Sequence, residues 1–361
     1  MHVILTSLTH TFPIPLAFST MANSKTPHQP HPNPNPNPNP KPLLLIHREP
    51  VPGLTSFEYL SSYFTLLDPT ADVGPDREAY KDTLRAHAGG VRAVYCSGLS
   101  QLGKDTMDCL PYLECVVGSS VGTDHIDLAE CGRRGISVAN IGDAFSTDVA
   151  EYAVGLLLDV LRGISTADRF VRVGSWPLCR EIPLGFSLTR KRVGIVGLGS
   201  IGSRVAKRLI PFGCTIAYTS RRNNPSVPYR FYDTVHNLAL ESDILILCCT
   251  LNDQTRHMIN KDVMTALGNK GILINVGRGG LIDEAEMVRF LVEGRLGGVG
   301  LDVYENEPSV PKELFGLNNV VMSPHQAVLT PESLQAAKDT ALGNLLAFFA
   351  NKPLLSPVKL D

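Results

Sequence analysis

The sequence predicts an α/β protein with two Rossmann-like or flavodoxin-like domains, each built on a parallel sheet, and a cleft between them. The length of 361 residues favours two domains. Short apolar runs alternate with segments of helical pattern, and strands separated by helices need crossover connections, which produce parallel sheets. A glycine-rich turn after one of these runs is typical of the same fold class.

Composition excludes several other classes. Hydrophobic residues make up 43% of the chain, which is enough for a sizeable core. The net charge of −2 argues against nucleic acid as the main partner, and no apolar run reaches the roughly 18 residues of a membrane span. The eight cysteines form no C-x-x-C, so we expect buried thiols in a reducing compartment and no metal site.

Residues 1–42 are expected to be a disordered, Pro/Asn-rich tail. Residues 31–40 read HPNPNPNPNP, and proline removes amide donors, so this stretch can form neither helix nor sheet. The first twenty residues lack the arginines of a transit peptide and the charged start of a secretory signal. We therefore expect a cytoplasmic protein, with organelle targeting by this tail as the open alternative.

The first folded segment is expected over residues 43–145. Its apolar runs are typical of buried strands, namely LLLI (43–46), AVYC (93–96), CVVG (115–118) and ISVAN (136–140). Ser146, Thr147 and Asp148 then offer N-cap oxygens for a long helix that is apolar on nearly every face. Such a helix must be buried between domains or against another chain, so the sequence predicts a homodimer.

The second segment, expected over 146–324, has a more regular strand–helix pattern. Its predicted strands lie in 192–199, 215–220, 243–250, 271–277, 296–303 and 319–324. The chain then ends with a helix from Pro331 to about Ala350, for which Thr330 is the expected N-cap.

A phosphate-binding loop is predicted at the start of the second segment. The loop consists of Gly197, Leu198, Gly199, Ser200, Ile201 and Gly202, in the pattern G-x-G-x-x-G. It follows a strand and opens a helix, which is the context that makes this pattern specific for a dinucleotide. The glycines permit a tight turn, close approach of a pyrophosphate and close helix–strand packing, while the helix N-terminus offers free amides.

The end of the next strand indicates which nicotinamide cofactor is preferred. An NAD site places Asp or Glu about 20 residues after the glycines, to bind the ribose 2′-hydroxyl. This chain has Ser220, Arg221 and Arg222 there instead. Two guanidiniums attract a 2′-phosphate, so we predict NADPH over NADH. The alternative is that both arginines are solvated loop charges.

Three further stretches carry a family resemblance. They read NVGRGGLIDE (275–284), GLDVYENEP (300–308) and SPHQA (323–327). Together with the phosphate loop they resemble the D-isomer-specific 2-hydroxyacid dehydrogenases, from about Leu43 to Val358. Within that family the chain is most similar to the plant glyoxylate/hydroxypyruvate reductases and hydroxyphenylpyruvate reductases. The resemblance implies a substrate domain made of 43–145 with 325–361, and a dinucleotide-binding domain at 146–324.

The resemblance assigns catalysis to Arg278, Glu307 and His325. Reduction of a 2-oxo acid needs its carboxylate held, its carbonyl polarised and its developing alkoxide protonated. Arg278 is a permanent forked cation suited to the first two tasks. His325 can donate a proton near neutral pH, and Glu307 would orient its ring. Each residue alone could be an ordinary loop residue, and the argument depends on the three together.

The same match implies further contacts. The amides of Ser120, Val121 and Gly122, together with Arg278, would hold the substrate carboxylate. Cofactor contacts are implied for Thr250, Val276, Gly277 and Asp302. The chain departs from the family pattern at 250–255, beside the cofactor, and at Gln326-Ala327, beside the substrate pocket.

The expected function is NADPH-dependent reduction of a small 2-oxo acid, glyoxylate or hydroxypyruvate, to the D-2-hydroxy acid. Three alternatives stay open. They are a 4-hydroxyphenylpyruvate reductase, a non-enzymatic protein that senses NAD(P)H and binds a partner, and a formate dehydrogenase. Glu307 argues against the last, since formate oxidation needs no proton relay.

Overall fold

The computed structural model describes residues 40–49, 57–98, 100–178 and 184–360. Lys41–Asp361 form one compact unit. The tail predicted at 1–42 lies, up to residue 39, outside the described residues. The rest of this section concerns the compact unit.

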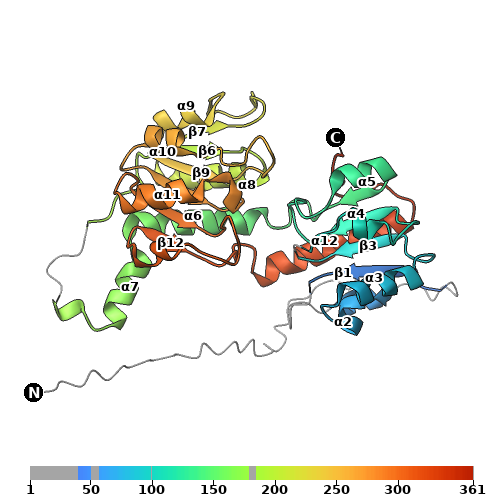
Figure 1. Cartoon of the computed structure of the whole chain (residues 1–361). Coiled ribbons are helices and arrows are strands. Elements are labelled where there is room, and N and C mark those ends of the chain that lie inside the picture. The colour runs from blue at the N-terminus through green and yellow to red at the C-terminus, as the bar shows by residue number, and fades with distance from the viewer. Residues whose placement is uncertain (1–39, 50–56, 99, 179–183, 361) are drawn as a thin grey trace, which may run out of the picture. The chain divides into compact units, whose positions relative to one another are not determined.

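The first half of the unit is a five-stranded parallel sheet in the order β2-β1-β3-β4-β5 (Figure 1). Its strands are β1 (Leu43–His47), β2 (Thr65–Leu67), β3 (Ala93–Cys96), β4 (Cys115–Gly118) and β5 (Ser137–Ala139). Its helices are α1 (Glu58–Ser61), α2 (Pro69–Val73), α3 (Arg77–Ala86), α4 (Lys104–Met107) and α5 (Leu128–Arg134). Four of the strands were predicted, whereas the short edge strand β2 was missed.

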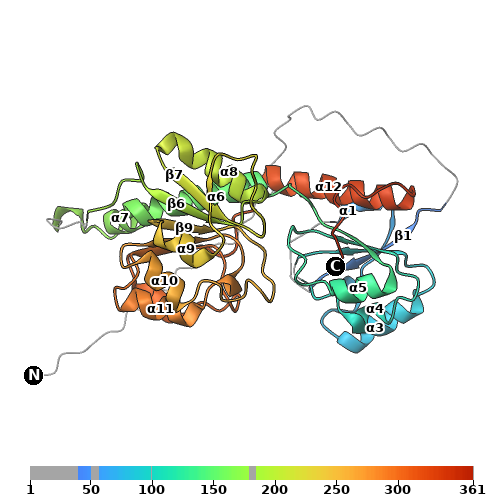
Figure 2. The ribbon, with the colours of Figure 1, turned by 90° about the horizontal axis from the view of Figure 1, so that it is seen from above.

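Alternate residues of these strands enter different cores. Leu44 and Ile46 belong to a cluster that includes Leu345 of the C-terminal helix α12 (Pro331–Phe349), while Leu45 packs in the cluster that includes Leu84 of α3. Helices therefore cover both faces of the sheet: α1 and α12 on one side, α3, α4 and α5 on the other (Figure 2). Burial on both faces explains why the strands read as continuous apolar runs.

The second half is a seven-stranded parallel sheet in the order β12-β11-β10-β9-β6-β7-β8. Its strands are β6 (Arg192–Val196), β7 (Thr215–Thr219), β8 (Arg230–Phe231), β9 (Ile244–Leu247), β10 (Ile272–Asn275), β11 (Gly298–Leu301) and β12 (Val320–Met322). Its α-helices are α6 (Ser146–Arg162), α7 (Ile164–Arg172), α8 (Ser200–Leu209), α9 (Val235–Leu240), α10 (Lys261–Leu267) and α11 (Glu284–Val292). Four 3₁₀ turns complete the described elements: η1 (Trp176–Leu178), η2 (Ile210–Phe212), η3 (Gly279–Leu281) and η4 (Lys312–Gly316).

The two parallel sheets confirm the predicted fold class. Along β9, Ile244 and Ile246 pack in the cluster that holds α6 and α8, whereas Leu245 and Leu247 pack in the cluster that holds α9, α10 and α11 (Figure 2). The strand order reverses between β6 and β9, and in α/β sheets ligands bind at the carboxyl ends of the strands beside such a reversal. The predicted phosphate loop follows β6 and therefore lies at this position.

The N-cap prediction for the long helix was wrong. Ser146 is already the first helical residue, and the N-cap position is Phe145, which makes no side-chain capping bond. The apolar faces of α6 are covered largely within the chain, by α8 and by strands β10, β11 and β12. Exposed apolar side chains gather instead on α7 and the segment after it, where Val173 is 73% and Trp176 67% exposed.

The C-terminal helix begins as predicted. Thr330 is the N-cap of α12, its hydroxyl accepts the Ser333 amide, and Pro331 occupies the first turn. Farther along, α12 packs against β4. The segment after it also returns to the first sheet, because the amide of Val358 donates to Val138 at 2.8 Å.

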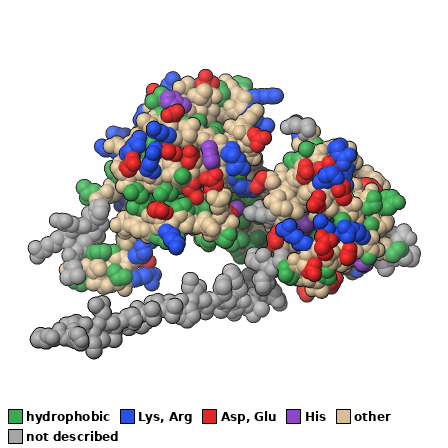
Figure 3. Space-filling view, viewed as in Figure 1, with side chains coloured by type: hydrophobic (Ala, Val, Ile, Leu, Met, Phe, Trp, Pro, Cys, Tyr) green, Lys and Arg blue, Asp and Glu red, His purple; other side chains and the backbone are tan. Residues whose placement is uncertain are grey.

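No helix among the described residues is both long enough and apolar enough to span a bilayer. On the face drawn in Figure 3, acidic and basic side chains are interspersed. That face therefore presents no continuous basic patch of the kind that nucleic acids require.

Asn344 is the central buried polar residue at the end of α12. It is 0% exposed. Its amide group donates to the Asn140 carbonyl oxygen and to the Ser356 hydroxyl, and its Oδ1 accepts from the amides of Leu355 and Ser356. The side chain therefore fastens α12 to the end of the first sheet and to the C-terminal segment.

We expect Asn344→Ala to lower the free energy of unfolding by about 2–4 kcal/mol, because it leaves several buried backbone groups unpaired. Denaturant titration of the wild type and the variant measures this difference. The matched control is Gln335→Ala on the exposed face of the same helix, which should stay within about 0.5 kcal/mol. Equal losses for the two variants would contradict this role of Asn344.

Candidate functional site

The phosphate loop joins β6 to α8, and two of its glycines are required by close contacts. Gly197 has φ +94°, and a Cβ there would lie 2.8 Å from the Cα of Cys249. A Cβ on Gly202 would overlap the carbonyl oxygen of Gly197, so the helix can begin this close to the strand only with glycine.

Gly199 differs from the other two glycines, because nothing lies within 4 Å of its ideal Cβ position. It is the N-cap of α8 and makes no side-chain capping bond, and the first amides of the helix, at Ser200 and Ile201, donate to no described residue. Leu198 packs partly against the core. This uncovered helix N-terminus fits a dinucleotide pyrophosphate.

The predicted 2′-phosphate residues follow β7 at the same edge of the sheet. Ser220 donates its hydroxyl to the Arg222 carbonyl oxygen at 2.6 Å, which folds the turn. Arg221 and Arg222 are exposed, and neither has an ion-pair partner among the described residues. Unpaired guanidiniums at this position fit the proposed preference for a phosphate over a ribose hydroxyl.

The turn after β10 holds Val276, Gly277 and Arg278. Asn275, the last residue of β10, is fully buried and organises this turn. Its side-chain amide donates to the Arg278 carbonyl oxygen at 3.0 Å, and its Oδ1 accepts the Gly277 amide at 3.1 Å. Sequence reasoning missed Asn275, although its place at the carboxyl end of a parallel strand was a usable signal.

Arg278 contacts the predicted carboxylate-binding loop. Its Nε donates to Asp124 at 3.3 Å, and a Cβ on Gly122 would overlap its guanidinium, so Gly122 leaves the space that Arg278 occupies. Sequence reasoning missed Asp124, which lies in the same stretch as Gly122. The arginine thus contacts a second loop in two ways: it forms an ion pair with Asp124, and its guanidinium packs against Gly122.

The loop 120–122 has the features of an anion site. The amides of Ser120, Val121 and Gly122 donate to no described residue. The carbonyl oxygen of Val121 accepts from the Asn140 side chain, and that of Gly122 accepts from the Ser120 hydroxyl. Free amides beside a half-buried arginine fit a carboxylate.

Glu307 and His325 form the predicted pair. Glu307 Oε2 lies 2.8 Å from His325 Nδ1, and its Oε1 accepts the Tyr304 amide at 3.0 Å. Burial alone would raise the pKa of Glu307, but the bonds from His325 and Tyr304 outweigh it and the pKa lies below its usual value. The carboxylate is therefore ionised at neutral pH and holds the ring by Nδ1.

Asp302 lies beneath the histidine loop. It is 1% exposed, its Oδ1 accepts from the Ser323 hydroxyl and the Gln326 amide, and its Oδ2 accepts from the Ala327 amide. The carbonyl oxygen of Asp302 also accepts the His325 amide at 2.8 Å. These bonds assign Asp302 to positioning His325, while its contact with the nicotinamide stays a prediction.

The loop 250–255, where the chain departs from the family pattern, has its own support. Asn252 Oδ1 accepts from the amides of Gln254 and Thr255, and the Thr255 hydroxyl donates to the Thr250 carbonyl oxygen at 2.8 Å. Such an Asx turn fixes the conformation of the loop. Thr250 stays exposed at this edge of the sheet.

His125 is a further titratable residue that the sequence reasoning did not identify. It is 2% exposed, and neither ring nitrogen has a hydrogen-bond partner among the described residues. Burial lowers the pKa of His125 and outweighs the opposing charge of Asp124, so the ring is neutral at pH 7. No group of His, Cys, Asp and Glu in the described part of the chain could hold a metal ion.

Comparison with known proteins places this arrangement in a family. Residues 154–327 match the model of the D-isomer specific 2-hydroxyacid dehydrogenase NAD binding domain. A glyoxylate/hydroxypyruvate reductase of Arabidopsis thaliana is 52% identical over 88% of this chain and 98% of its own length. A hydroxyphenylpyruvate reductase of Plectranthus scutellarioides is 47% identical over 78% of this chain and 89% of its own.

Solved structures agree with these relatives. The NADPH-dependent glyoxylate/hydroxypyruvate reductase of Sinorhizobium meliloti, in complex with NADP and malonate, is similar with a TM-score of 0.78 and 35% identity. The match covers 88% of this chain and 97% of that one. The identity and coverage of these relatives, together with the matching domain model, show that the chain belongs to the D-isomer-specific 2-hydroxyacid dehydrogenases.

Proposed function

We propose that the protein reduces a small 2-oxo acid, glyoxylate or hydroxypyruvate, to the D-2-hydroxy acid with NADPH. The observation that carries the proposal is the Glu307–His325 hydrogen bond, on a loop that Asp302 holds in place. The guanidinium of Arg278 lies against Gly122, in the loop whose amides are free. The reductases of Arabidopsis and Sinorhizobium support the choice of substrate and cofactor.

The two halves of the chain take different tasks in this proposal. Residues 146–324 form the dinucleotide-binding domain, and 43–145 with 325–361 form the substrate domain. The phosphate loop 197–202 holds the pyrophosphate, while Val276 and Gly277 border the nicotinamide half. When bound, NADPH supplies the hydride.

The residues of the chain supply the polar part of the reaction. The amides of 120–122 and the guanidinium of Arg278 bind the substrate carboxylate, and Arg278 also polarises the carbonyl. Because Nδ1 of His325 is engaged by Glu307, the proton that reaches the product oxygen leaves from Nε2. The Glu307 carboxylate holds the ring in the orientation for that transfer.

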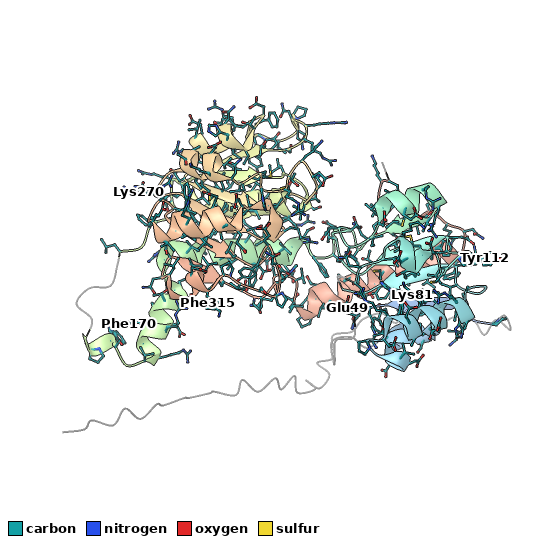
Figure 4. The ribbon with its side chains drawn as sticks, viewed as in Figure 1. Glu49, Lys81, Tyr112, Phe170, Lys270 and Phe315 are labelled. Atoms are coloured by element: carbon teal, nitrogen blue, oxygen red, sulfur yellow. The ribbon has the colours of Figure 1, made fainter. Side chains whose placement is uncertain are left out.

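4-Hydroxyphenylpyruvate is the second candidate substrate. A cavity of about 310 Å³ lies beside Glu307 and His325, and its other lining residues are mostly apolar, including Tyr304, Val310 and Phe315. Phe315, labelled in Figure 4, is 62% exposed on η4. An aryl ring would find apolar contacts there.

We also propose a homodimer and a cytoplasmic location. The dimer is supported by the exposed apolar side chains of Ile164, Val171, Val173 and Trp176 on and after α7. The sequence pointed to α6 as the interface, but other elements of the chain largely cover that helix. We therefore propose that the interface lies on α7 and the segment after it. Organelle targeting by the tail remains the alternative location.

The reaction is tested by following NADPH absorbance with glyoxylate, hydroxypyruvate and 4-hydroxyphenylpyruvate, and NADP⁺ reduction with formate. We expect turnover of the first two oxo acids and a D-configured product, since Arg278 and His325 serve any 2-oxo acid of small size. Tight nucleotide binding without turnover would favour the sensor alternative. Formate oxidation would favour the formate dehydrogenase.

His325→Ala should lower kcat by about 10²–10⁴-fold, because it removes the proton donor. Steady-state kinetics measures this, with circular dichroism and NADPH binding as checks that the variant is folded. His236→Ala, on the exposed surface of α9, is the matched control and should retain normal turnover. Wild-type turnover in His325→Ala would refute the assignment.

The double variant Ser220→Asp, Arg221→Ala should reverse the preference for NADPH over NADH, because a carboxylate there repels a 2′-phosphate and binds a 2′-hydroxyl. The ratio of kcat/KM for the two cofactors should shift by at least about tenfold, or 1.4 kcal/mol. Lys270→Ala removes an exposed cation just before β10, at the opposite edge of the sheet, and is the control (Figure 4). An unchanged ratio in the double variant would show that Arg221 is a solvated charge.

A further inference from the structure

A second His–Glu pair lies next to the catalytic one. His257 Nε2 is 2.5 Å from Glu305 Oε1, and their side chains are 41% and 23% exposed. Glu305 precedes the catalytic Glu307 by two residues. The function proposed above gives this second pair no task.

The pair spans the turn that carries Arg278. On one side of the turn, a Cβ on Gly279 would overlap the backbone of Tyr304 and Glu305, so the two backbones are in direct contact. On the other side, the His257 amide donates to the Gly280 carbonyl oxygen at 2.8 Å. The side chain of His257 then reaches Glu305, so the contacts form a closed ring around Gly279 and Gly280.

The segment that carries Glu307 is held by the same ring. The Glu305 amide donates to Oε2 of Glu284, which is 9% exposed at the start of α11. The Tyr304 amide donates to Glu307 itself. Three segments are therefore stacked: the Arg278 turn lies between the loop 255–259 and the segment 304–307. The His257–Glu305 hydrogen bond joins the two outer segments.

The backbone of His257 is adapted to this contact. Its φ of +51° lies in the left-handed region, which non-glycine residues adopt at a cost unless their surroundings hold them. The bond from its amide to Gly280 and the side-chain hydrogen bond to Glu305 are the interactions that hold it. A strained residue with two specific bonds indicates a required position.

We propose that His257 and Glu305 are positioning residues that set the spacing between Arg278 and the Glu307–His325 pair. This inference rests on the proposed function, because the spacing matters only if one substrate must meet both groups. Neither side chain needs to touch the substrate. Loss of the pair would leave each group intact but let their separation vary, and displacements of about 1 Å can cost up to 10²-fold in rate.

The test compares two variants at position 257, one at 305 and a control at 236. His257→Asn suits the left-handed backbone but is too short to reach Glu305, whereas His257→Gln places an amide nitrogen where Nε2 lies. We expect kcat to fall about tenfold in His257→Asn and in Glu305→Ala, with KM and the NADPH Kd changed less than twofold. His257→Gln should restore most of kcat, and the control His236→Asn should leave it unchanged.

The double variant His257→Asn, Glu305→Ala gives a second measure. If the two residues act through their mutual bond, its kcat should equal that of either single variant, because the second change removes nothing further. Additive losses of kcat in the double variant would overturn the proposal. So would a fall in kcat that is accompanied by a lower melting temperature and is not rescued by His257→Gln, because that result would indicate a general loss of stability.

Hydrogen exchange keeps the proposal testable without turnover. In His257→Asn we expect faster amide exchange than in wild type at 279–283 and 303–308, and unchanged exchange in His236→Asn. If exchange in His257→Asn is the same as in wild type at both segments, 279–283 and 303–308, the inference is overturned whatever reaction the protein catalyses. If wild type reduces no oxo acid, the proposed function fails, and exchange still decides whether the pair restrains the turn.

Discussion

The hydrogen bond between Glu307 and His325 is the interaction on which the rest of the site depends. It joins a carboxylate on the segment after β11 to a ring on the loop after β12, and each partner has its own support. Tyr304 donates to Glu307 through its amide, and Asp302 binds the loop of His325 through both of its oxygens. The half-buried Glu307 carboxylate keeps its charge because His325 and the Tyr304 amide both donate to it.

Close backbone approach is the second constraint. Gly197 and Gly202 allow β6 and α8 to meet at the phosphate loop, and Gly122 leaves room for the Arg278 guanidinium. Gly279 brings the Arg278 turn against the segment of Glu307. Any side chain at these positions would overlap a neighbour. The glycines therefore allow the close approaches that place the phosphate loop and Arg278 beside their neighbours.

The sequence predicted much of the fold for a clear reason. Strands buried on both faces are continuously apolar, so ten of the twelve strands could be identified, while β2 and β8, of three and two residues, could not. Capping oxygens located α12 through Thr330 but misplaced the start of α6, since that helix begins without a side-chain cap. The lesson is that a cap residue predicts a boundary only when its bond is made.

The sequence by itself determined the glycine loop, the absence of a carboxylate after β7, and the identities of Arg278, Glu307 and His325, because each depends on residue type at a local spacing. Only the tertiary structure decided that Asp124 reaches Arg278, that Asn275 shapes its turn, and that His257 meets Glu305. The partners in the first and last of these contacts lie 154 and 48 residues apart. Asp124 and Arg278 follow strands of different sheets, β4 and β10, whereas His257 and Glu305 follow β9 and β11 of the same sheet. Such contacts depend on how the strands assemble into sheets and how the sheets pack, and no local sequence pattern encodes that assembly.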